Sequence, residues 1–411
     1  MIYKVLCGDV LQVLTEQKEA LGVFDAVLSD PPYGISFMGR EWDHGVPSKE
    51  VFEALKSCLK PGSPVIAFGG TRTFHRLAVS MEDAGLEIRD CFSWLYSNGY
   101  PKNLNVAKGL EELAGKEPEL LGVTSNNPRL RPNAHHAQVD FDRPNMSYGA
   151  AALHNHERRI YAYSDPLAQA YEGYGTALKP SWEPAILARV PLSGTVAQNV
   201  AEHGVGALNI PDSKIYAGAK EGRFPTNVLF DEDTSRMLDE DVGHLHGSGN
   251  KNRSVRAPRS EEFVVPYGSY GGDRNEAFVD NEGGPPSRFY YCSKASSKER
   301  ELGLDSLRDN IPYTSKLGDA KRVNDHPTAK PIDLARYLAK LLLPPPRQDG
   351  KPRRILVPYS GVGSEMIGCM LAGWDEVYGI EIDPHYVELA QMRLAYWKHD
   401  MEESAPAPSL F

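Results

Sequence analysis

The chain has 411 residues and a formal net charge of −10, and its 41% hydrophobic and 24% charged residues are ordinary for a globular protein. No apolar run approaches the roughly 18 residues needed to cross a bilayer, and no charged-then-apolar leader opens the chain. These features exclude a membrane protein and predict a cytoplasmic one of prokaryotic or phage origin. The scattered cysteines and the histidines lack C-x-x-C and H-E-x-x-H spacings, so we expect neither disulfides nor a metal site.

The first hundred residues alternate short apolar segments with amphipathic ones. The segment "SKEVFEALKSCLKPG" (48–62) begins with a serine, places Phe52, Leu55 and Leu59 on one face and ends at Pro-Gly, as a helix does. "TRTFHRLAVSMEDAG" (71–85) has a similar pattern. Strands that alternate with helices predict an α/β fold, in which helices cover a parallel sheet. We expect strands at 3–9, 26–30, 63–70 and 86–96.

The alternation is lost in the middle of the chain and returns near its end. Between about 105 and 325, Asn, Pro, Gly, Ser and Tyr are common, which predicts a loop-rich insertion or a second domain. "PIDLARYLAKLLLPPP" (331–346) then predicts a helix that starts at a proline and is stopped by three others. The later predictions are a strand at 353–360, helices at 364–373 and 384–397, a strand at 376–383, and a frayed tail.

A glycine turn follows the strand expected at 353–360. Gly361-Val362-Gly363 precedes a helix, and the next strand ends at Glu381, where a carboxylate can hold both ribose hydroxyls. Dinucleotide enzymes use a third glycine so that a pyrophosphate meets the helix N-terminus, but this turn continues with Ser, Glu and Met. Glu365 would repel a phosphate and tolerate a cationic sulfonium. The turn therefore favours S-adenosylmethionine over a nicotinamide dinucleotide.

Several motifs, in this order along the chain, resemble a known family. They are Asp30-Pro31-Pro32-Tyr33, "YCSKASSKERELG" (291–303), "HPTAKPIDLARYL" (326–338), the glycine turn and "GIE" (379–381). The set resembles the amino-group DNA methyltransferases of the β class, whose catalytic motif precedes the cofactor motifs. The resemblance implies a Rossmann-like, S-adenosylmethionine-dependent methyltransferase sheet, circularly permuted, with a loop-rich inserted target-recognition region.

The resemblance also suggests a division of the chain. We expect a catalytic half at 1–110, a loop-rich insertion at 111–180, a return strand at 181–194, a target-recognition region at 195–290, a cofactor-binding half at 291–400 and a flexible tail at 401–411.

One position departs from the family pattern. The family usually has Asp-Pro-Phe before the glycines, whereas this chain has Val357-Pro358-Tyr359. The missing carboxylate would lie near the methionine amino group of the cofactor. Either the affinity for the cofactor is lower, or another acid, Glu365 or Asp9, takes its place.

The Asp-Pro-Pro-Tyr residues suit chemistry on the amino group of a base. The lone pair of such an amine is delocalised into the ring, and acceptors opposite its N–H bonds favour the reactive, tetrahedral nitrogen. Asp30 offers a carboxylate oxygen, and Pro31 offers a carbonyl that Pro32 helps to hold rigidly. Tyr33 offers a surface on which a flipped base can stack. The target atom is inaccessible in a duplex, so the base must first leave the stack.

By resemblance, a second set of residues binds S-adenosylmethionine. These residues are Asp9, His326, Thr328, Lys330, Tyr359, Gly361, Gly363 and Glu381. Asp9 equally fits the N-cap of a helix, and the two roles are compatible. The segment that holds His326, Thr328 and Lys330 also reads as a polar loop before a helix.

Contacts with DNA are expected from two other segments. Phe37 and Trp42 follow the catalytic motif and would close over the flipped base, or else pack in the interior. Three cations of the "KNRSVRAPRS" segment (251–260) would contact phosphates or guanine edges, although a solvated loop explains the same charges. These cations are Arg253, Arg256 and Arg259.

The function that these motifs favour is methylation of the N6 atom of adenine in duplex DNA, because Asp rather than Ser begins the catalytic motif. Cytosine-N4 methylation on the same scaffold, a catalytically weak DNA-binding relative and a nicotinamide-dependent oxidoreductase are the alternatives. The partner is double-stranded DNA. A homodimer and a cognate restriction endonuclease are further partners that the resemblance allows.

Overall fold

The computed structural model describes most of the chain. The described residues are 1–36, 43–97, 99, 103–125, 157–216, 222–245, 284–293, 299–308, 323–324, 326 and 329–404. No helix within these ranges is both long enough and apolar enough to cross a membrane.

A central sheet organises the described residues, and its strands lie in the order β1-β11-β10-β2-β3-β7-β4-β8-β9. Neighbouring strands are parallel except at β7, which is antiparallel to both β3 and β4. The strands are β1 (Ile2–Cys7), β2 (Ala26–Ser29), β3 (Pro64–Phe68), β4 (Glu87–Leu95), β7 (Trp182–Arg189), β8 (Val228–Asp231), β9 (Tyr291–Ser293), β10 (Arg354–Pro358) and β11 (Glu376–Glu381). The predicted α/β fold is confirmed.

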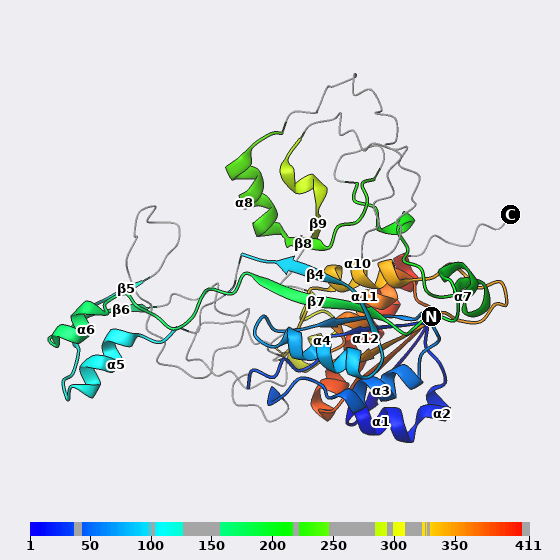
Figure 1. The fold of residues 1–411 in the computed structure, drawn as a ribbon, viewed down its shortest axis with the longest axis horizontal. Helices are drawn as coiled ribbons and strands as arrows, with labels where there is room; N and C mark the ends of the chain where they lie inside the picture. Colours follow the sequence, from blue (N-terminus) through cyan, green and yellow to red (C-terminus); the bar gives the residue numbers. More distant parts are fainter. Residues whose placement is uncertain are drawn as a thin grey trace, which may run out of the picture.

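Helices cover both faces of this sheet (Figure 1). One layer contains α1 (Val10–Glu16), α3 (Lys49–Ser57) and α4 (Phe74–Asp83), and α2 (Lys18–Leu21) follows α1. The other layer contains α10 (Ile332–Leu342), α11 (Ser364–Ala372) and α12 (Pro384–Ser404). Strand β2 shows why its sequence is continuously apolar: Val27 packs against the first layer, and Leu28 packs against the second.

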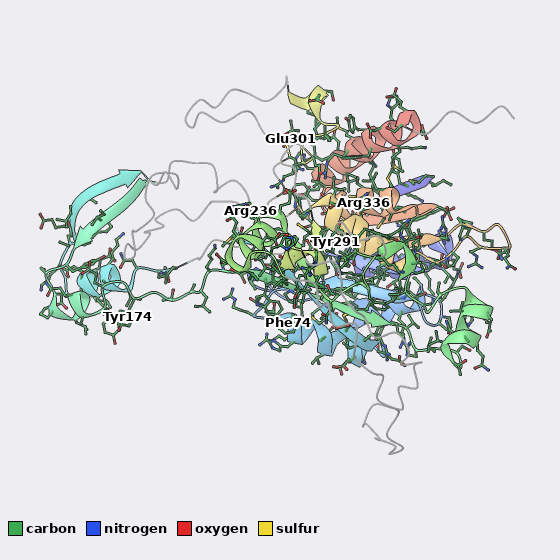
Figure 2. All side chains as sticks on the ribbon, turned by 90° about the horizontal axis from the view of Figure 1, so that it is seen from above. Phe74, Tyr174, Arg236, Tyr291, Glu301 and Arg336 are labelled. Carbon is green, nitrogen blue, oxygen red and sulfur yellow. The ribbon has the colours of Figure 1, made fainter. Side chains whose placement is uncertain are left out.

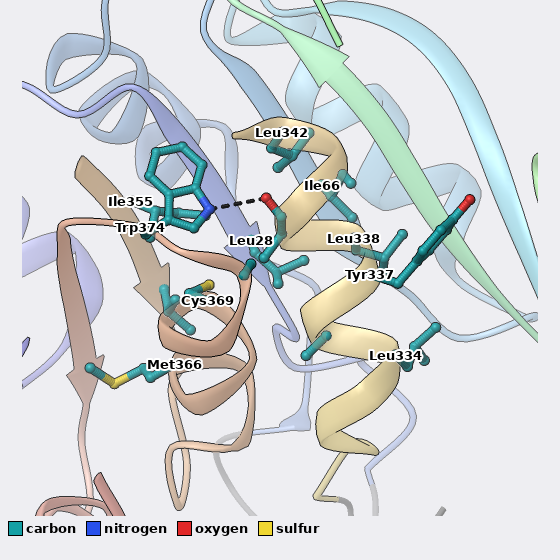
Figure 3. Packing of buried hydrophobic residues seen from close by; sticks show 14 of the residues in the cluster. Leu28, Ile66, Leu334, Tyr337, Leu338, Leu342, Ile355, Met366, Cys369 and Trp374 are labelled. Carbon is teal, nitrogen blue, oxygen red and sulfur yellow. Dashed lines mark hydrogen bonds between the residues drawn. The ribbon is translucent and has the colours of Figure 1, made fainter. Parts of the chain in front are cut away.

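The apolar faces of α10 and α11 pack against each other above the sheet. Leu334 and Leu338 of α10 share a buried cluster with Met366 and Cys369 of α11 (Figure 3). The Trp374 Nε1–H, just after α11, donates to the carbonyl oxygen of Ala339 at 3.0 Å. The amphipathic pattern that predicted the helix at 331–346 is therefore explained by burial against α11 and the sheet.

The middle of the chain holds more regular structure than its composition predicts. It includes α7 (Val196–His203), η3 (Pro211–Ser213), α8 (Glu232–Val242), η4 (Pro286–Phe289) and α9 (Asp305–Arg308). Strands β8 and β9 extend the sheet beyond β4, which the sequence analysis did not predict. They are only four and three residues long, so they offer too little periodicity to be distinguished from loops.

A small arm projects from the body (Figures 1 and 2). It consists of α5 (Val106–Leu113), β5 (Glu119–Ser125), β6 (Glu157–Ala162) and α6 (Pro166–Ala170), and β5 pairs with β6. The arm has its own buried cluster, formed by Ala107, Tyr163 and Ala168. Figure 2 places Tyr174 on the arm, well away from the body.

Candidate active site

The carboxyl ends of β2 and β10 open into one large cavity. These strands are parallel neighbours, so the residues that follow them emerge at the same edge of the sheet. The cavity has a volume of about 1510 Å³, and it is lined by Asp30 after β2 and by Gly361 after β10. Two segments more than three hundred residues apart in sequence thus meet at the position where open α/β sheets bind their ligands.

The turn that carries the Asp-Pro-Pro-Tyr residues is fixed by a buried carboxylate. Asp43 is 1% exposed, and its Oδ1 and Oδ2 accept the N–H groups of Gly34 and Ile35 at 2.8 and 3.3 Å. Gly34 has a φ of 66°, which a residue without a Cβ adopts readily. The sequence analysis missed Asp43, because a single acid in a polar segment looks like any solvated residue.

Four side chains form a network at the cavity wall. The Tyr33 hydroxyl donates to Asp30 Oδ1 at 2.8 Å and also contacts Glu183. The Lys330 ammonium donates to Asp30 Oδ2 at 2.9 Å and lies 2.6 Å from Glu183 Oε1. Glu183, on β7, was not among the predicted residues. Lys330, which was expected on the cofactor side, instead contacts the predicted catalytic carboxylate.

Burial and charge set the protonation of this network. Burial raises the pKa of Asp30, the Lys330 ammonium lowers it, and Glu183 raises it again, with a net increase. Burial alone would lower the pKa of Lys330, but Asp30 and Glu183 together outweigh it and raise that pKa. The pKa of Tyr33 is raised by burial and by both carboxylates. The site therefore holds a charged lysine between two acids, with a neutral tyrosine.

The glycine turn forms the opposite wall. Glu381 is 8% exposed, and its two carboxylate oxygens accept the N–H groups of Gly361 at 2.8 Å and Asp383 at 2.9 Å. Gly361 has a φ of 49°, and a Cβ there would lie 2.9 Å from His326 Nε2. The glycine therefore leaves room for the His326 ring beside the turn. The second lone pairs of the Glu381 oxygens can accept ribose hydroxyls.

A family model described as DNA methylase, N6_N4_Mtase, matches residues 24–392, which include both walls of the cavity. The chain belongs to this family. Methylases of the family use S-adenosylmethionine and act on DNA, which confirms the predicted cofactor and substrate class at this coarser level. The Rossmann-like reading of the sheet agrees with this membership.

Solved structures of methylases are similar to the chain only at low identity. Matches include M1.HpyAVI (10% identity, 96% of this chain and 98% of that chain, TM-score 0.40) and its complex with S-adenosylmethionine (11%, 95% and 100%, TM-score 0.38). The cytosine-N4-specific PvuII DNA methyltransferase also matches (10%, 96% and 86%, TM-score 0.43). At these TM-scores no residue role is transferred. A comparison with curated proteins finds no match.

Three other cofactor residues predicted for this methylase, Asp9, His326 and Tyr359, line the same cavity. Asp9 lines the cavity and caps α1, because its Oδ1 accepts the Gln12 N–H at 3.0 Å. His326 also lines the cavity, and its ring meets Tyr386 edge-on at 4.8 Å between centroids. Tyr359 has a φ of 58°, an uncommon conformation for a side chain of its size.

Gly363 differs from Gly361. It begins α11 with a φ of 79°, and a Cβ there would lie 3.2 Å from the Cβ of Ala390, so it allows close packing with α12. Gly363 is absent from the residues that line the cavity among the described ones. Arg393 of α12 is 1% exposed and donates to the carbonyl oxygen of the neighbouring Val362 at 2.6 Å. Arg393 was not predicted.

Val357 occupies the position of the missing acid in this methylase, and Glu365 is one of the acids expected to replace it. Val357 is buried in β10 and packs in the core on the α10 and α11 side. Glu365, in the first turn of α11, lines the cavity and is 5% exposed. Burial, followed by the charge of Asp30, raises its pKa to about 7. The cavity of the methylase therefore contains a carboxylate, from Glu365, although this chain has no acid at position 357.

The remaining predicted residues lie outside the described part of the methylase. These residues are Thr328, Phe37, Trp42, Arg253, Arg256 and Arg259.

Proposed function

We propose that this methylase transfers a methyl group from S-adenosylmethionine to the N6 atom of adenine in duplex DNA, after the base has flipped out of the helix. The observation that carries the proposal is the single cavity in which Asp30 faces the Gly361 turn. We also propose that the order of β2 before β10 in the chain reflects the circularly permuted, β-class arrangement.

The proposed cofactor side of the cavity combines bare backbone, carboxylates and aromatic rings. Gly361 lines the cavity and gives the backbone against which the cofactor lies, and Glu381 accepts the ribose hydroxyls. Glu365 takes the place of the absent acid at position 357 and pairs with the methionine ammonium. His326, Tyr359 and Asp9 complete the wall. When bound, S-adenosylmethionine supplies an electrophilic methyl group.

On the other side, the chain activates the amine. An oxygen of Asp30 and the carbonyl oxygen of Pro31 accept the two N–H bonds of the amino group, so that its lone pair points at the methyl carbon. The nitrogen loses a proton when it gains the methyl group, and Asp30, whose pKa is raised, is placed to take that proton. Stacking of the flipped base on Tyr33 remains a prediction.

A product analysis tests this function. The protein is incubated with methyl-labelled S-adenosylmethionine and mixed-sequence duplex DNA, and the DNA is then digested to nucleosides and separated. We expect labelled N6-methyl-2′-deoxyadenosine, and a loss of about 100-fold or more in the Asp30→Ala variant, because the acceptor that activates the amine is gone.

Other products would contradict the proposal in distinct ways. Labelled N4-methyl-2′-deoxycytidine would place the enzyme in the alternative class on the same scaffold. Absence of any methylated base would favour a catalytically weak DNA-binding relative, and calorimetry with S-adenosylmethionine then shows whether the cofactor site itself is functional. The target-recognition role of residues 195–290 is proposed on resemblance, and sequencing of methylated DNA identifies the site that it reads.

A further inference from the structure

Two carboxylates share two hydrogen-bond donors beside the cavity. Lys330 and Tyr33 each contact both Asp30 and Glu183. The side chains of Lys330, Asp30 and Glu183 are 6%, 12% and 16% exposed, so water can replace few of these contacts. If the acids are ionised and the tyrosine is neutral, the network has a net charge of −1.

This sharing conflicts with the chemistry proposed for Asp30. Both oxygens of Asp30 already accept a hydrogen bond, one from Tyr33 and one from the Lys330 ammonium. A cation 2.9 Å from a carboxylate draws away the charge that should polarise an incoming amine. The two donors cannot simply be released, because a buried ammonium without a partner is strongly disfavoured.

Glu183 resolves this conflict, because it is in contact with both donors. We propose that Glu183 is a positioning residue that retains the Lys330 ammonium and the Tyr33 hydroxyl when the amino group of the target base binds Asp30. Lys330 and Tyr33 then keep a charged acceptor, and the Asp30 carboxylate turns to the base. No covalent bond changes in this exchange, and no proton moves to Glu183. The inference rests on the proposed function.

The topology explains how Glu183 reaches the site. The residues that follow parallel strands lie at the carboxyl edge of the sheet, where Asp30 lies. Strand β7 runs antiparallel, with Ala185 opposite Phe68 of β3 and Glu183 opposite Trp94 of β4. The first residues of β7 therefore lie at the edge where its neighbours end, and Glu183 points into the cavity from there.

The charges around Asp30 predict the direction in which each substitution shifts the pH dependence of the rate. The titratable groups that face it are Lys330 before α10, Glu183 on β7, Tyr33 in its own turn and Glu365 on α11. Glu183 raises the pKa of Asp30 and Lys330 lowers it. A neutral residue in place of Glu183 should therefore move the acid limb of the pH–rate profile to lower pH. A neutral residue in place of Lys330 should move the same limb to higher pH.

The experiment compares wild-type enzyme with Glu183→Gln, Glu183→Asp and a matched control, Glu87→Gln. Glu87 pairs with Arg189 on the same strand pair, β4 and β7, away from the cavity. Single-turnover methyl transfer to duplex DNA is measured across pH. Saturating S-adenosylmethionine is used so that titration of Glu365 in the free enzyme does not affect the measured pH dependence. Calorimetry measures cofactor affinity, and circular dichroism follows thermal unfolding.

We expect Glu183→Gln to lower the single-turnover rate by roughly tenfold or more and to move the acid limb to lower pH, with cofactor affinity unchanged. Glu183→Asp should return the acid limb of the pH–rate profile to its wild-type position, because it restores the charge. Glu87→Gln should have the wild-type rate and profile. A wild-type rate and pH profile in Glu183→Gln would overturn the inference. So would a rate loss matched by equal losses of cofactor affinity and thermal stability in both Glu183 variants.

The outcome also separates this inference from the proposed function. A wild-type enzyme that methylates no duplex overturns both. A wild-type enzyme that forms N6-methyl-2′-deoxyadenosine, with an unshifted profile in Glu183→Gln, leaves the proposed function standing and removes only the role of Glu183.

Discussion

At the scale of single residues, Glu365 is the acid that we propose takes the place of the carboxylate missing at position 357. The strand that ends at Pro358 has Val357 where the family has an acid, and that valine is fully buried in the core. Glu365 enters the same cavity from the next helix. A buried carboxylate with no cation bound is unfavourable when ionised, which is why its pKa is raised to about 7.

Glu365→Gln should therefore have opposite effects on binding and on stability. We expect weaker binding of S-adenosylmethionine, and loss of the wild-type increase in affinity as pH rises through about 7, because only the ionised acid pairs with the ammonium. Isothermal titration calorimetry at several pH values measures both effects. An unchanged affinity at pH 8 would exclude Glu365 as the substitute acid.

The same variant should stabilise the ligand-free protein at high pH. The pKa of Glu365 is higher in the folded state than the ordinary value of 4.5, so the folded protein holds more protons and loses stability as pH rises from about 4.5 to about 7. Removing the charge should recover about 3 kcal/mol of unfolding free energy at pH 8. Urea unfolding of both proteins at pH 5 and pH 8 measures the difference, which should be small at pH 5.

At the scale of elements, the α10 and α11 pair fixes both walls of the cavity. Lys330 lies just before α10, and the glycine turn lies just before α11, so the distance between these helices sets the distance between the walls. The helices approach so closely that a Cβ on Gly368 of α11 would lie 2.6 Å from the Cβ of Ala335 on α10. Glycine at 368 is required by this contact rather than by its own backbone angles.

Gly368→Ala should consequently destabilise the protein, although alanine is the better helix former. We expect a loss of about 2 kcal/mol in unfolding free energy, because the extra methyl group must push the helices apart. Gly109→Ala in α5 is the matched control, since a Cβ there meets no atom within 4 Å. Thermal unfolding should show a lower midpoint for Gly368→Ala only, and an equal shift in both variants would contradict the packing explanation.

At the scale of the whole molecule, the cavity and a buried ionic cluster lie at opposite edges of the sheet. The cavity lies at the carboxyl edge of β2 and β10, whereas Asp25 ties their amino ends together. Asp25 is 1% exposed; it accepts the Arg354 N–H at 2.7 Å, contacts Lys60, and lies 3.7 Å from the guanidinium of Arg347. This cluster joins the N-terminal and C-terminal parts of the chain at the edge away from the reaction.

Asp25→Ala should then reduce stability without changing the site. We expect a loss of about 3 kcal/mol in unfolding free energy, because buried donors lose their acceptor, with unchanged affinity for S-adenosylmethionine. Asp349→Ala removes an exposed partner of the same Arg347 and serves as the control, with little change expected. Denaturant unfolding and calorimetry measure the two properties, and a parallel fall in affinity would show that the two edges are coupled.

Local sequence patterns predict the helices and strands of the chain and the chemistry of two of its segments. Period and caps are local properties, so helices such as that at 331–346 and strands such as that at 26–30 were predicted close to where they lie. The order of motifs predicts that Asp30 and Gly361 share one site, and both residues line one cavity. These predictions succeeded because each rests on neighbouring residues or on a shared motif.

The single polar residues that complete the site are identified by contacts across the fold. Glu183, Asp43 and Arg393 each sit in sequence that looks ordinary, within a strand, a polar turn and a helix. Their roles arise because an antiparallel strand reverses direction beside parallel ones, and because buried charges must find partners across the fold. Such partnerships join residues that are distant along the chain, so no local pattern in the sequence contains them.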